Sequence, residues 1–463
     1  MFLEKIRHKN ILVVGMARSG VAAARFLLDL GAHGVIANDF NHINNLEAEA
    51  KELEKIPQVK MVTGGHPLEL ITDDLSLVVK SPGVPPDLKI FQEARMKKVP
   101  VISEIELAYP FIKAPIIGIT GTNGKTTTTN LVAEILQEGE INKVFKAGNI
   151  GNPLVDVAGK ATAGDMVVAE LSSFQLDDIA YFRPFISVIL NIKDDHLNYH
   201  GDRNNYIRAK SKILANQGGS DIAILNADDE LVISLKEKVS ATPLFFSNEQ
   251  LVEGFCLKDN CLGLYQNGKF RVICEEKELP MPGKHNRENA LAAAAAAWGA
   301  GVNLDTIGRG LHSFKGVEHR LELACEIDGV TFVNDSKGTN PEASEKALEA
   351  FPGQNKIMIA GGKDKKADFQ RLAHSIANNQ VELLILLGET AFQIKETVAQ
   401  LGFDQVEIVN SLEEAVVRSW QHSKPGDVVL FSPACASWDM FKDYEERGRS
   451  FKENVKMLPT KHD

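Results

Sequence analysis

One segment of the sequence places glycines, a lysine and hydroxyl side chains in an order that suits a bound phosphate: Gly121-Thr122-Asn123-Gly124-Lys125-Thr126-Thr127. It lies between an apolar run, 116–119, that predicts a strand and a pattern that predicts a helix over 127–137. Glycines let backbone N–H groups approach phosphate oxygens, Lys125 brings a positive charge, and the Thr126 hydroxyl can bind Mg²⁺. The usual P-loop has a further glycine where this chain has Ile119, so the loop is a shorter variant. We predict an ATP site here, and a glycine turn without a ligand is the alternative.

Two later apolar runs, 166–169 and 186–190, lead into side chains that could complete such a site. Glu170 follows the first run, and His196 comes shortly after the second. Ligands of open α/β sheets collect at the carboxyl ends of the strands, so Glu170 and His196 could face Lys125 across one crevice. A carboxylate suits Mg²⁺ well, whereas an imidazole suits it poorly. Taken alone, His196 could equally be a loop histidine without a function.

A second candidate site lies near the start of the chain. The pattern there predicts a strand over 11–14, a glycine-rich turn, a helix over 21–30 and a strand from 34 that ends near Asp39, which is a Rossmann-like opening. Ala17 stands where the second glycine of a dinucleotide fingerprint would allow close approach of a pyrophosphate, so a dinucleotide site is not favoured. A nucleotide-containing ligand at the helix N-terminus, with Asp39 on a ribose or base edge, and a βαβ unit without a ligand both stay open.

Parallel sheets are needed to position these side chains, and the rest of the sequence indicates them. Short apolar, β-rich runs alternate with helical patterns along the chain, which is typical of parallel sheets flanked by helices. At 463 residues the chain is too long for one core, because cores stop growing beyond roughly 250 to 300 residues. We therefore expect an α/β protein of two or three domains.

Composition restricts the classes of function. Apolar residues make up 44% and charged residues 24%, and no apolar run approaches the roughly 20 residues of a membrane span. The net charge of −11 argues against a nucleic-acid partner. The basic segment 1–10 precedes an apolar run too short for an export signal. Five scattered cysteines indicate a reducing compartment and no disulfide framework, and we expect them to be structural rather than metal ligands or nucleophiles: Cys256, Cys261, Cys274, Cys325 and Cys435.

Three motifs taken together resemble those of the Mur ligase family: the loop 121–127, Glu170-Leu171-Ser172-Ser173-Phe174-Gln175 and Asp195-His196. The resemblance spans the whole chain and implies three domains. These would be an N-terminal, Rossmann-like UDP-sugar-binding domain (1–103), a central P-loop ATPase domain with a mostly parallel sheet (104–316), and a C-terminal Rossmann-like domain (317–463). The last would bind the amino acid and contribute to the ATP site. The family also includes folylpolyglutamate synthase, which shares the central motifs.

The resemblance implies roles for individual residues of the central and C-terminal domains. Lys210 matches the family's carbamylated lysine, whose carbamate is an oxygen ligand for a second Mg²⁺. Related sequences commonly have aspartate where this chain has Asn198, so the role of Asn198 stays open. The implied catalytic residues are Lys125, His196 and Lys210. The implied metal ligands are Thr126, Glu170, His196 and the carbamate of Lys210. The implied ATP contacts outside the loop are Asn286, Asn289, Arg320, Asp335 and Lys337.

The resemblance also implies contacts for the two other substrates. The segment Ser432-Pro433-Ala434-Cys435-Ala436-Ser437-Trp438-Asp439 resembles that of the D-glutamate-adding member more than those of its siblings. The implied D-glutamate contacts are Thr339, Lys365, Ser437, Trp438 and Tyr444. Lys363 and Lys366 are the alternatives to Lys365. The implied UDP-sugar contacts are Ala17, Arg18, Ser19, Asp39, Ser81, Gly83, Asn149 and Ser172.

By this resemblance the chain is expected to be a cytoplasmic, monomeric, ATP-dependent ligase of peptidoglycan precursor synthesis, and so of cell-wall growth, cell shape and cell division. It would join the L-alanine carboxylate of UDP-N-acetylmuramoyl-L-alanine to the amine of D-glutamate through an acyl phosphate, with two Mg²⁺ ions. The alternatives are a sibling Mur ligase, a folylpolyglutamate synthase-like ligase, a nucleotide-dependent switch and a nicotinamide dehydrogenase. The dehydrogenase would leave Lys125 without a purpose, and the switch would leave Glu170, His196 and Lys210 without one.

Overall fold

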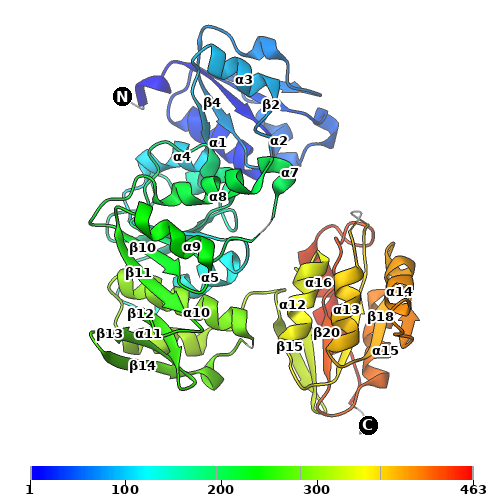
Figure 1. Cartoon of the computed structure of the whole chain (residues 1–463). Helices are drawn as coiled ribbons and strands as arrows, with labels where there is room; N and C mark the ends of the chain where they lie inside the picture. Colours follow the sequence, from blue (N-terminus) through cyan, green and yellow to red (C-terminus); the bar gives the residue numbers. More distant parts are fainter. Residues whose placement is uncertain (1–2, 194, 282, 365–366, 461–463) are drawn as a thin grey trace. The chain divides into compact units, whose positions relative to one another are not determined.

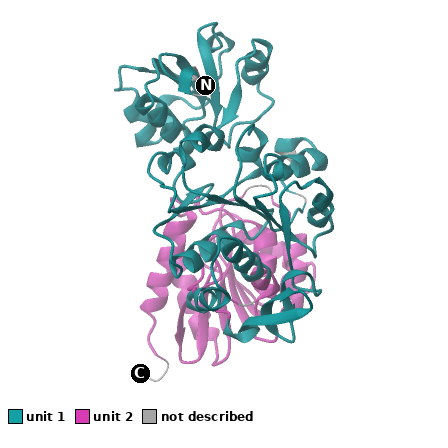
Figure 2. Ribbon diagram, turned by 90° about the vertical axis from the view of Figure 1, so that its left-hand side faces the viewer, with its two compact units in different colours: residues 1–278, 288–313 teal, residues 279–287, 314–463 magenta. Residues whose placement is uncertain are grey.

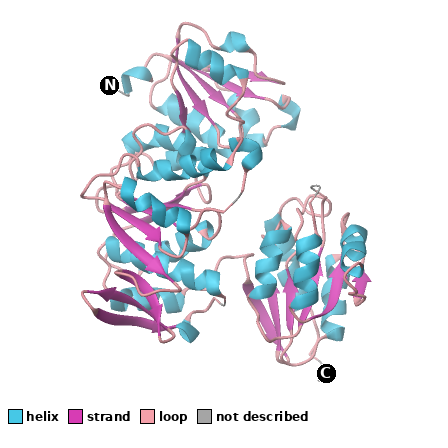
Figure 3. Cartoon of the chain, in the orientation of Figure 1, coloured by secondary structure: helices cyan, strands magenta, loops and turns pink. Residues whose placement is uncertain are grey.

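The computed structural model describes residues 3–193, 195–281, 283–364 and 367–460. It contains two compact units (Figure 2): Met1–Glu278 with Glu288–Ser313, and Leu279–Arg287 with Phe314–Asp463. The described residues form three sheets, two of them in the first unit and one in the second. Helices flank each sheet (Figure 3), as the alternating pattern predicts. No helix among the described residues has the length and apolar character needed to cross a bilayer.

The first sheet is entirely parallel, in the order β3-β2-β1-β4-β5 (Figure 1). Its strands are β1 Asn10–Val14, β2 Gly34–Asp39, β3 Val59–Thr63, β4 Leu75–Lys80 and β5 Val101–Ser103. The helices that accompany it are α1 Arg18–Asp29, α2 Ala48–Leu53 and α3 Lys89–Met96. Strand order reverses beside β1. The loops that follow β1, β2 and β4 therefore lie together at the carboxyl edge of this sheet, where ligands of such sheets bind. This confirms the Rossmann-like opening predicted from the sequence.

Two predicted helix starts are wrong by two or three residues, and glycine explains both. The first helix, predicted over 21–30, begins at Arg18, because Gly20 packs so closely on the β1–α1 turn that a Cβ there would lie 1.8 Å from the Gly15 carbonyl oxygen. The second, predicted over 127–137, begins at Lys125, because Gly124 is the N-cap in a left-handed conformation (φ +86°). Apolar periodicity cannot detect a first helical turn that packs backbone against backbone.

The second sheet has nine strands in the order β14-β13-β12-β11-β10-β9-β6-β8-β7. Strands β6 to β12 all pair in parallel. Strands β13 and β14 are antiparallel additions at one edge. The strands are β6 Ile116–Thr120, β7 Val144–Gly148, β8 Met166–Glu170, β9 Ile186–Ile189, β10 Ile222–Asn226, β11 Thr242–Ser247, β12 Gly254–Lys258, β13 Cys261–Gln266 and β14 Lys269–Glu275. Because β6 lies between β8 and β9, the loop after β6 is flanked by the ends of both neighbours.

The helices of this part are numerous and mostly short. They are α4 Glu104–Ala108, α5 Lys125–Gln137, α6 Ser173–Asp177, α7 Leu197–His200, α8 Arg203–Ser211, α9 Glu230–Ser234, α10 Lys284–Gly299 and α11 Leu304–Ser313. The alanine-rich second half of α10 is buried from Ala290 to Ala297. Small side chains on every face let this helix pack closely on all sides.

Two buried glutamates in α4 join the first sheet to the second. Glu106 accepts hydrogen bonds from the backbone N–H groups of Ala180, Tyr181 and Phe182, at 3.0, 2.8 and 2.9 Å. The Oε1 atom of Glu104 accepts from the Val155 N–H at 2.7 Å, and its Oε2 atom has no hydrogen-bond partner among the described residues. Burial raises the pKa of Glu104 to about 7, against the lowering effect of the Val155 N–H.

This burial predicts a stability effect in Glu104→Gln. Because the folded pKa of about 7 lies above the ordinary 4.5, the folded state holds the proton more tightly, and stability is lost as pH rises from about 4.5 through 7. Glutamine keeps the acceptor for Val155 and removes the buried charge. We expect the variant to match wild type near pH 5 and to melt at a higher temperature at pH 8, by an amount equivalent to about 2–3 kcal/mol. Melting curves at both pH values check this, with the exposed Glu138→Gln as control; an equal difference at both pH values would contradict it.

The third sheet has the order β15-β16-β20-β17-β18-β19, antiparallel only between β15 and β16. Its strands are β15 Glu322–Ile327, β16 Val330–Asn334, β17 Lys356–Ala360, β18 Val381–Leu386, β19 Val406–Ile408 and β20 Val428–Phe431. Its helices are α12 Pro341–Glu349, α13 Gln370–Asn378, α14 Ala391–Ala399, α15 Leu412–His422 and α16 Tyr444–Lys456. Along β17, Ile357 and Ile359 join one apolar cluster while Met358 and Ala360 join the other, so both faces of the sheet are covered.

The N-cap of α12 is an asparagine four residues before the buried Ser344. Asn340 is the N-cap, and its side-chain oxygen accepts from the Ala343 N–H at 2.9 Å. Ser344 is instead buried inside the helix, with its hydroxyl 2.7 Å from that of Ser432. A proline at the first helical position, Pro341, favours a helix start there.

Candidate active site

The phosphate-type loop, residues 121–127, follows a fully buried strand and leads into a helix, as the sequence predicts. All five residues of β6 are buried, and α5 starts directly after Gly124, which has no side chain to cap it. A Cβ on Gly124 would lie 2.3 Å from Oδ1 of Asn289 on α10, so only glycine fits beneath that side chain. The first N–H groups of α5 therefore point into the loop, where an anion would be stabilised.

Two lysines converge on one carbonyl oxygen of this loop. Lys125 Nζ donates to the carbonyl oxygens of Gly121 and Thr122 at 2.9 and 2.8 Å. Lys210, brought from α8, donates to the same Gly121 oxygen at 2.7 Å. The fold thus brings Lys210 to this loop across 89 residues of sequence, a contact that the sequence did not predict.

Lys210 is a buried amine with an unusual environment. Its side chain is 2% exposed and its Nζ lies 4.8 Å from the centre of the Tyr206 ring. Burial, and after it the charge of Lys125, lower the pKa of Lys210 well below its ordinary value, although Asp195 and Glu170 act in the opposite direction. A lowered pKa increases the fraction of neutral amine, which is the form that can react with CO₂. The chemistry of this site therefore fits a carbamylated lysine.

Glu170 lies at the end of β8 beside the loop. Its Oε2 atom accepts from the Thr126 hydroxyl at 2.8 Å, and its Oε1 atom accepts from the Asn149 side-chain amide at 2.9 Å. The carboxylate is 2% exposed. The hydroxyl and carboxylate that the sequence assigned to Mg²⁺ are therefore neighbours, while Asn149 contacts Glu170 directly.

His196 has a conformation that few residues adopt. Its φ of +52° lies in the left-handed region, where a non-glycine residue is strained, and such strain occurs often at functional sites. Its ring packs 4.8 Å from that of Phe174 and lies 3.4 Å from an Asp195 carboxylate oxygen. Burial, with the charges of Lys125 and Lys210, lowers its pKa although Asp195 raises it. A lowered pKa favours the neutral imidazole, which is the form that can bind a metal.

The donor set fits Mg²⁺ better than a tighter-binding metal. No group of three or more His, Cys, Asp and Glu side chains that could hold a metal occurs in the described part of the chain. Mg²⁺ keeps several waters and is bound by one or two carboxylates together with substrate phosphates. A hydroxyl and a carboxylate from Thr126 and Glu170, with a carbamate from Lys210, meet that requirement.

Tyr206 and Asn191 belong to this site but were not predicted. The Tyr206 hydroxyl lies 3.0 Å from that of Thr122, and Asn191 Oδ1 accepts from the Asn123 N–H at 2.8 Å. Tyr206 stands four residues before Lys210 on α8, so the two share one helix face, and this spacing could have revealed it. Asn191 shows no such pattern.

The predicted UDP-sugar residues gather at two places in the first unit. Ser81, after β4, donates its hydroxyl to the Gly15 carbonyl oxygen at 2.7 Å, and Asp39, after β2, accepts from the Met16 and Asn41 N–H groups at 2.7 and 2.8 Å. These side chains, with Ala17, Arg18, Ser19 and Gly83, occupy the carboxyl edge of the first sheet. Asn149 and Ser172 lie instead at the edge of the second sheet, where Ser172 caps α6 in a capping box with Gln175.

The two predicted asparagines of α10 fall on either side of the boundary between the compact units. Asn289 groups with the first unit and accepts from the Thr128 hydroxyl of α5 at 3.3 Å. Asn286, one turn earlier, groups with the second unit. The contact of Asn289 with α5 places it beside the phosphate-type loop.

In the second unit, loops after β16 and β20 bring Asp335 and Ser432 together. Ser432 donates its hydroxyl to Asp335 at 2.6 Å, and the Leu321 N–H donates to the other carboxylate oxygen at 3.2 Å. Burial raises the pKa of Asp335 to about 6, although the Ser432 hydroxyl and the charge of Arg320 lower it. The predicted pair Arg320 and Asp335 thus interact electrostatically within one unit.

Arg447, which was not predicted, holds the two loops together. It donates to the Ser336 hydroxyl and carbonyl oxygens at 3.1 and 2.8 Å and to the Cys435 carbonyl oxygen at 3.1 Å. Burial lowers its pKa to about 10. Arg447 is buried in α16, three residues after Tyr444. No sequence pattern marks an arginine whose partners are mostly backbone oxygens.

Three of the predicted D-glutamate residues, Thr339, Ser437 and Trp438, lie on these same loops, and a fourth, Tyr444, is the first residue of α16. Lys337 Nζ lies 5.6 Å from the centre of the Tyr444 ring, Thr339 follows two residues later, and Ser437 is buried while Trp438 is 65% exposed. Lys363 forms an ion pair with Glu389 at 2.7 Å. Lys365 and Lys366 lie outside the described residues.

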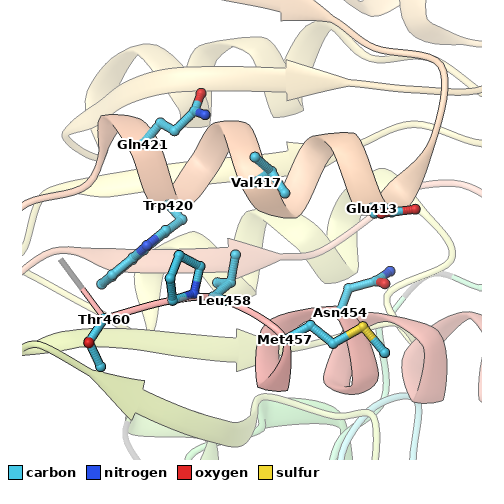
Figure 4. A pocket seen from close by; sticks show the side chains of 9 residues that line it. Glu413, Val417, Trp420, Gln421, Asn454, Met457, Leu458 and Thr460 are labelled. Atoms are coloured by element: carbon cyan, nitrogen blue, oxygen red, sulfur yellow. The ribbon is translucent and has the colours of Figure 1, made fainter. Parts of the chain in front are cut away.

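The cysteines and the described pocket lie outside this chemistry. All five cysteines are free thiols, and burial raises the pKa of Cys435 to about 11, which makes it a poor nucleophile. A pocket of about 430 Å³ lies between α15 and the segment after α16 (Figure 4). It is lined by Glu413, Val417, Trp420, Gln421, Asn454, Met457, Leu458, Pro459 and Thr460, none of which is a predicted site residue.

Three family models match the chain in order. They describe a Mur ligase MurD-like N-terminal domain at residues 9–103, a Mur ligase middle domain at 119–297 and a Mur ligase glutamate ligase domain at 319–435.

Curated relatives match nearly the full length. UDP-N-acetylmuramoylalanine--D-glutamate ligase of Pelotomaculum thermopropionicum is 44% identical over 98% of this chain and 99% of its own. The protein of the same name in Clostridioides difficile is 43% identical, with the same coverage.

Two solved structures share the fold at lower identity. UDP-N-acetylmuramate-alanine ligase MurC from Thermotoga maritima has a TM-score of 0.61 and 22% identity, covering 97% of this chain and 99% of its own. MurF ligase from the same organism, in complex with ADP, has a TM-score of 0.58 and 17% identity, covering 98% and 96%.

Proposed function

Because the chain belongs to the Mur ligase family, we propose that it joins the amine of D-glutamate to the L-alanine carboxylate of UDP-N-acetylmuramoyl-L-alanine at the expense of ATP. The observation that carries this proposal is the 44% identity, over 98% of the chain, to a ligase of that name. The reaction is a step of peptidoglycan precursor synthesis.

The mechanism follows from the weakness of a carboxylate as an acyl donor. Its oxygen becomes a leaving group when the carboxylate attacks the γ-phosphate of ATP, which yields an acyl phosphate and ADP. The D-glutamate amine then attacks the acyl carbon, phosphate departs, and the amine loses a proton as the amide forms. In the phosphoryl transfer the chain contributes position and charge: Lys125 and the N–H groups at the start of α5 neutralise the phosphate oxygens.

We propose that Thr126, Glu170, His196 and a carbamate on Lys210 hold two Mg²⁺ ions. The ions would supply positive charge to the phosphate oxygens as ATP is cleaved. Support comes from the 2.8 Å contact of Thr126 with Glu170 and from the buried, low-pKa amine of Lys210. The lowered pKa of His196 favours the neutral imidazole, which ligation requires.

The remaining predicted contacts are kept as part of the proposal. Asn286 and Asn289 of α10, with Arg320, Asp335 and Lys337 of the C-terminal region, would contact ATP. Thr339, Lys365, Ser437, Trp438 and Tyr444 would contact D-glutamate. We assign residues 1–103, 104–316 and 317–463 to the UDP-sugar, ATPase and amino-acid domains. One chain would then carry every group of the site, so we propose that the enzyme acts as a monomer, in the cytoplasm where its substrates and ATP occur.

Phosphate release tests the proposal. With ATP, Mg²⁺ and UDP-N-acetylmuramoyl-L-alanine present, we expect turnover when D-glutamate is added and none with L-glutamate, L-alanine or meso-diaminopimelate. Turnover with another amino acid would keep the ligase chemistry and overturn the choice of D-glutamate. Slow phosphate release whose rate does not change when the UDP-sugar or any amino acid is added would favour a nucleotide-dependent switch instead.

A further inference from the structure

A tyrosine from a helix beside the second sheet contacts both ends of the loop that follows β4 in the first sheet. Tyr199, on α7, accepts a hydrogen bond from Lys80 Nζ at 2.6 Å and donates its hydroxyl hydrogen to the Val84 carbonyl oxygen at 3.2 Å. Lys80 is the last residue of β4, and Val84 follows the loop of residues 81–83. The proposed UDP-sugar contacts Ser81 and Gly83 lie between these two anchors.

An ion pair supports the same contact from the other side. Lys80 Nζ lies 2.8 Å from an Asp178 carboxylate oxygen, just after α6, and the Lys80 side chain is 1% exposed. Arg95, on α3, lies 3.9 Å from the other Asp178 oxygen. Burial would lower the pKa of Lys80, yet Asp178 and Tyr199 raise it above its ordinary value, so the ammonium stays charged. Two cationic side chains, one from β4 and one from α3, thus lie close to the carboxylate of Asp178, which follows α6.

Tyr199 is also connected to the candidate metal ligand His196. Its ring packs 4.2 Å from that of Phe174, whose other neighbours are the rings of His196 at 4.8 Å and His200 at 5.6 Å. His200 in turn lies 3.0 Å from the Ser173 hydroxyl. The short segment 196–200, which includes α7, therefore contacts both ends of the loop 81–83 through Tyr199. The same segment carries His196, whose ring is near enough to Lys125 and Lys210 to feel their charges.

We propose that Tyr199, held by Lys80 and Asp178, is a positioning residue that fixes the UDP-sugar loop 81–83 relative to the turn bearing His196. The inference rests on the proposed function and deepens it. The substrate must reach from the edge of the first sheet to the γ-phosphate at the edge of the second, so its reacting carboxylate is aligned only if the two edges keep a fixed separation. Small misplacements of a reacting group lower rates by large factors.

Tyr199→Phe tests this because it keeps the ring on Phe174 and removes both hydrogen bonds. We expect the Kd and KM for UDP-N-acetylmuramoyl-L-alanine to rise roughly tenfold, because a charge-assisted hydrogen bond is lost, and kcat to fall severalfold. The KM for ATP and that for D-glutamate should stay within about twofold. Tyr181→Phe is the matched control, because this tyrosine is 73% exposed and only its backbone N–H is bound to Glu106.

A neutral pair separates positioning from stability. In Lys80→Met with Asp178→Asn no buried charge is left unpaired, so the melting temperature should return close to that of wild type, whereas the single Lys80→Met should melt lower. The KM for the UDP-sugar should stay raised in the double variant, because Tyr199 still lacks its donor.

Recovery of the wild-type KM in the double variant, or an unchanged KM in Tyr199→Phe, would overturn the inference while leaving the proposed function intact. A wild-type enzyme that fails to bind the UDP-sugar at all would overturn both. Binding is measured directly by calorimetry without ATP, so it does not depend on turnover.

Discussion

Lys125→Ala is expected to lower kcat for phosphate release by about a thousandfold, because a preorganised charge opposite a developing phosphoryl charge is worth that order of rate. Lys125 Nζ rests on the Gly121 and Thr122 carbonyl oxygens, 2.9 and 2.8 Å away, from where it can turn to a phosphate. Steady-state phosphate release checks the prediction. Lys125→Arg should recover little activity, since a planar guanidinium cannot occupy the position of a compact ammonium.

The control for Lys125 is a lysine of the same compact unit that lies outside the site. Lys146, on β7, is exposed and contacts Asn130 at 2.8 Å, and Lys146→Ala should keep nearly full activity. Melting curves show whether Lys125→Ala remains folded. A folded Lys125→Ala protein with activity within tenfold of wild type would contradict both the ATP site and the role of this ammonium.

Lys210→Ala is expected to lower activity by two to three orders of magnitude, about as much as the loss of one preorganised transition-state contact. The wild-type enzyme should lose activity when CO₂ is removed exhaustively and recover it when bicarbonate is added, because the neutral amine that burial favours reacts with CO₂. The variant should not respond to bicarbonate, and small carboxylates such as acetate should restore part of its activity by supplying the missing oxygen ligand.

Carbamylation can also be observed without turnover. Carbon-13 labelled bicarbonate should give a carbamate resonance in the wild-type protein and none in Lys210→Ala, while the exposed Lys160→Ala should keep both the resonance and the activity. An enzyme that is fully active without CO₂ and shows no resonance would contradict the carbamate. Lys210 would then act only through its hydrogen bond to Gly121.

Local sequence was sufficient to predict structure where one short segment forms a complete strand, loop and helix. The loop 121–127 has its glycine, lysine and threonine in fixed order, and a strand before and a helix after are enough to orient them. Glu170 and His196 could be assigned to the same edge because parallel strands all point their carboxyl ends one way. The alternation of strands and helices likewise predicted the α/β class with mostly parallel sheets.

Prediction failed where a helix boundary or a contact depends on backbone conformation and close packing, which residue type and apolar spacing do not encode. The starts of α1 and α5 were misplaced because close glycine packing, and not apolar periodicity, sets them. Arg447 was not predicted, because most of its partners are backbone oxygens, which every residue carries.

The sequence by itself determined the order of strand, glycine loop and helix around residues 121–127, the acid at the end of β8 and the α/β class. Each of these depends on residue type and on short spacing along the chain. Only the tertiary structure decided that Lys210 donates to Gly121 from 89 residues away and that Tyr199 meets Lys80 across 119. Those contacts arise from strand order and helix packing, which bring distant segments together and exclude water from between them. Burial then lowers the pKa of Lys210, whereas the same lysine on the surface would stay almost fully protonated.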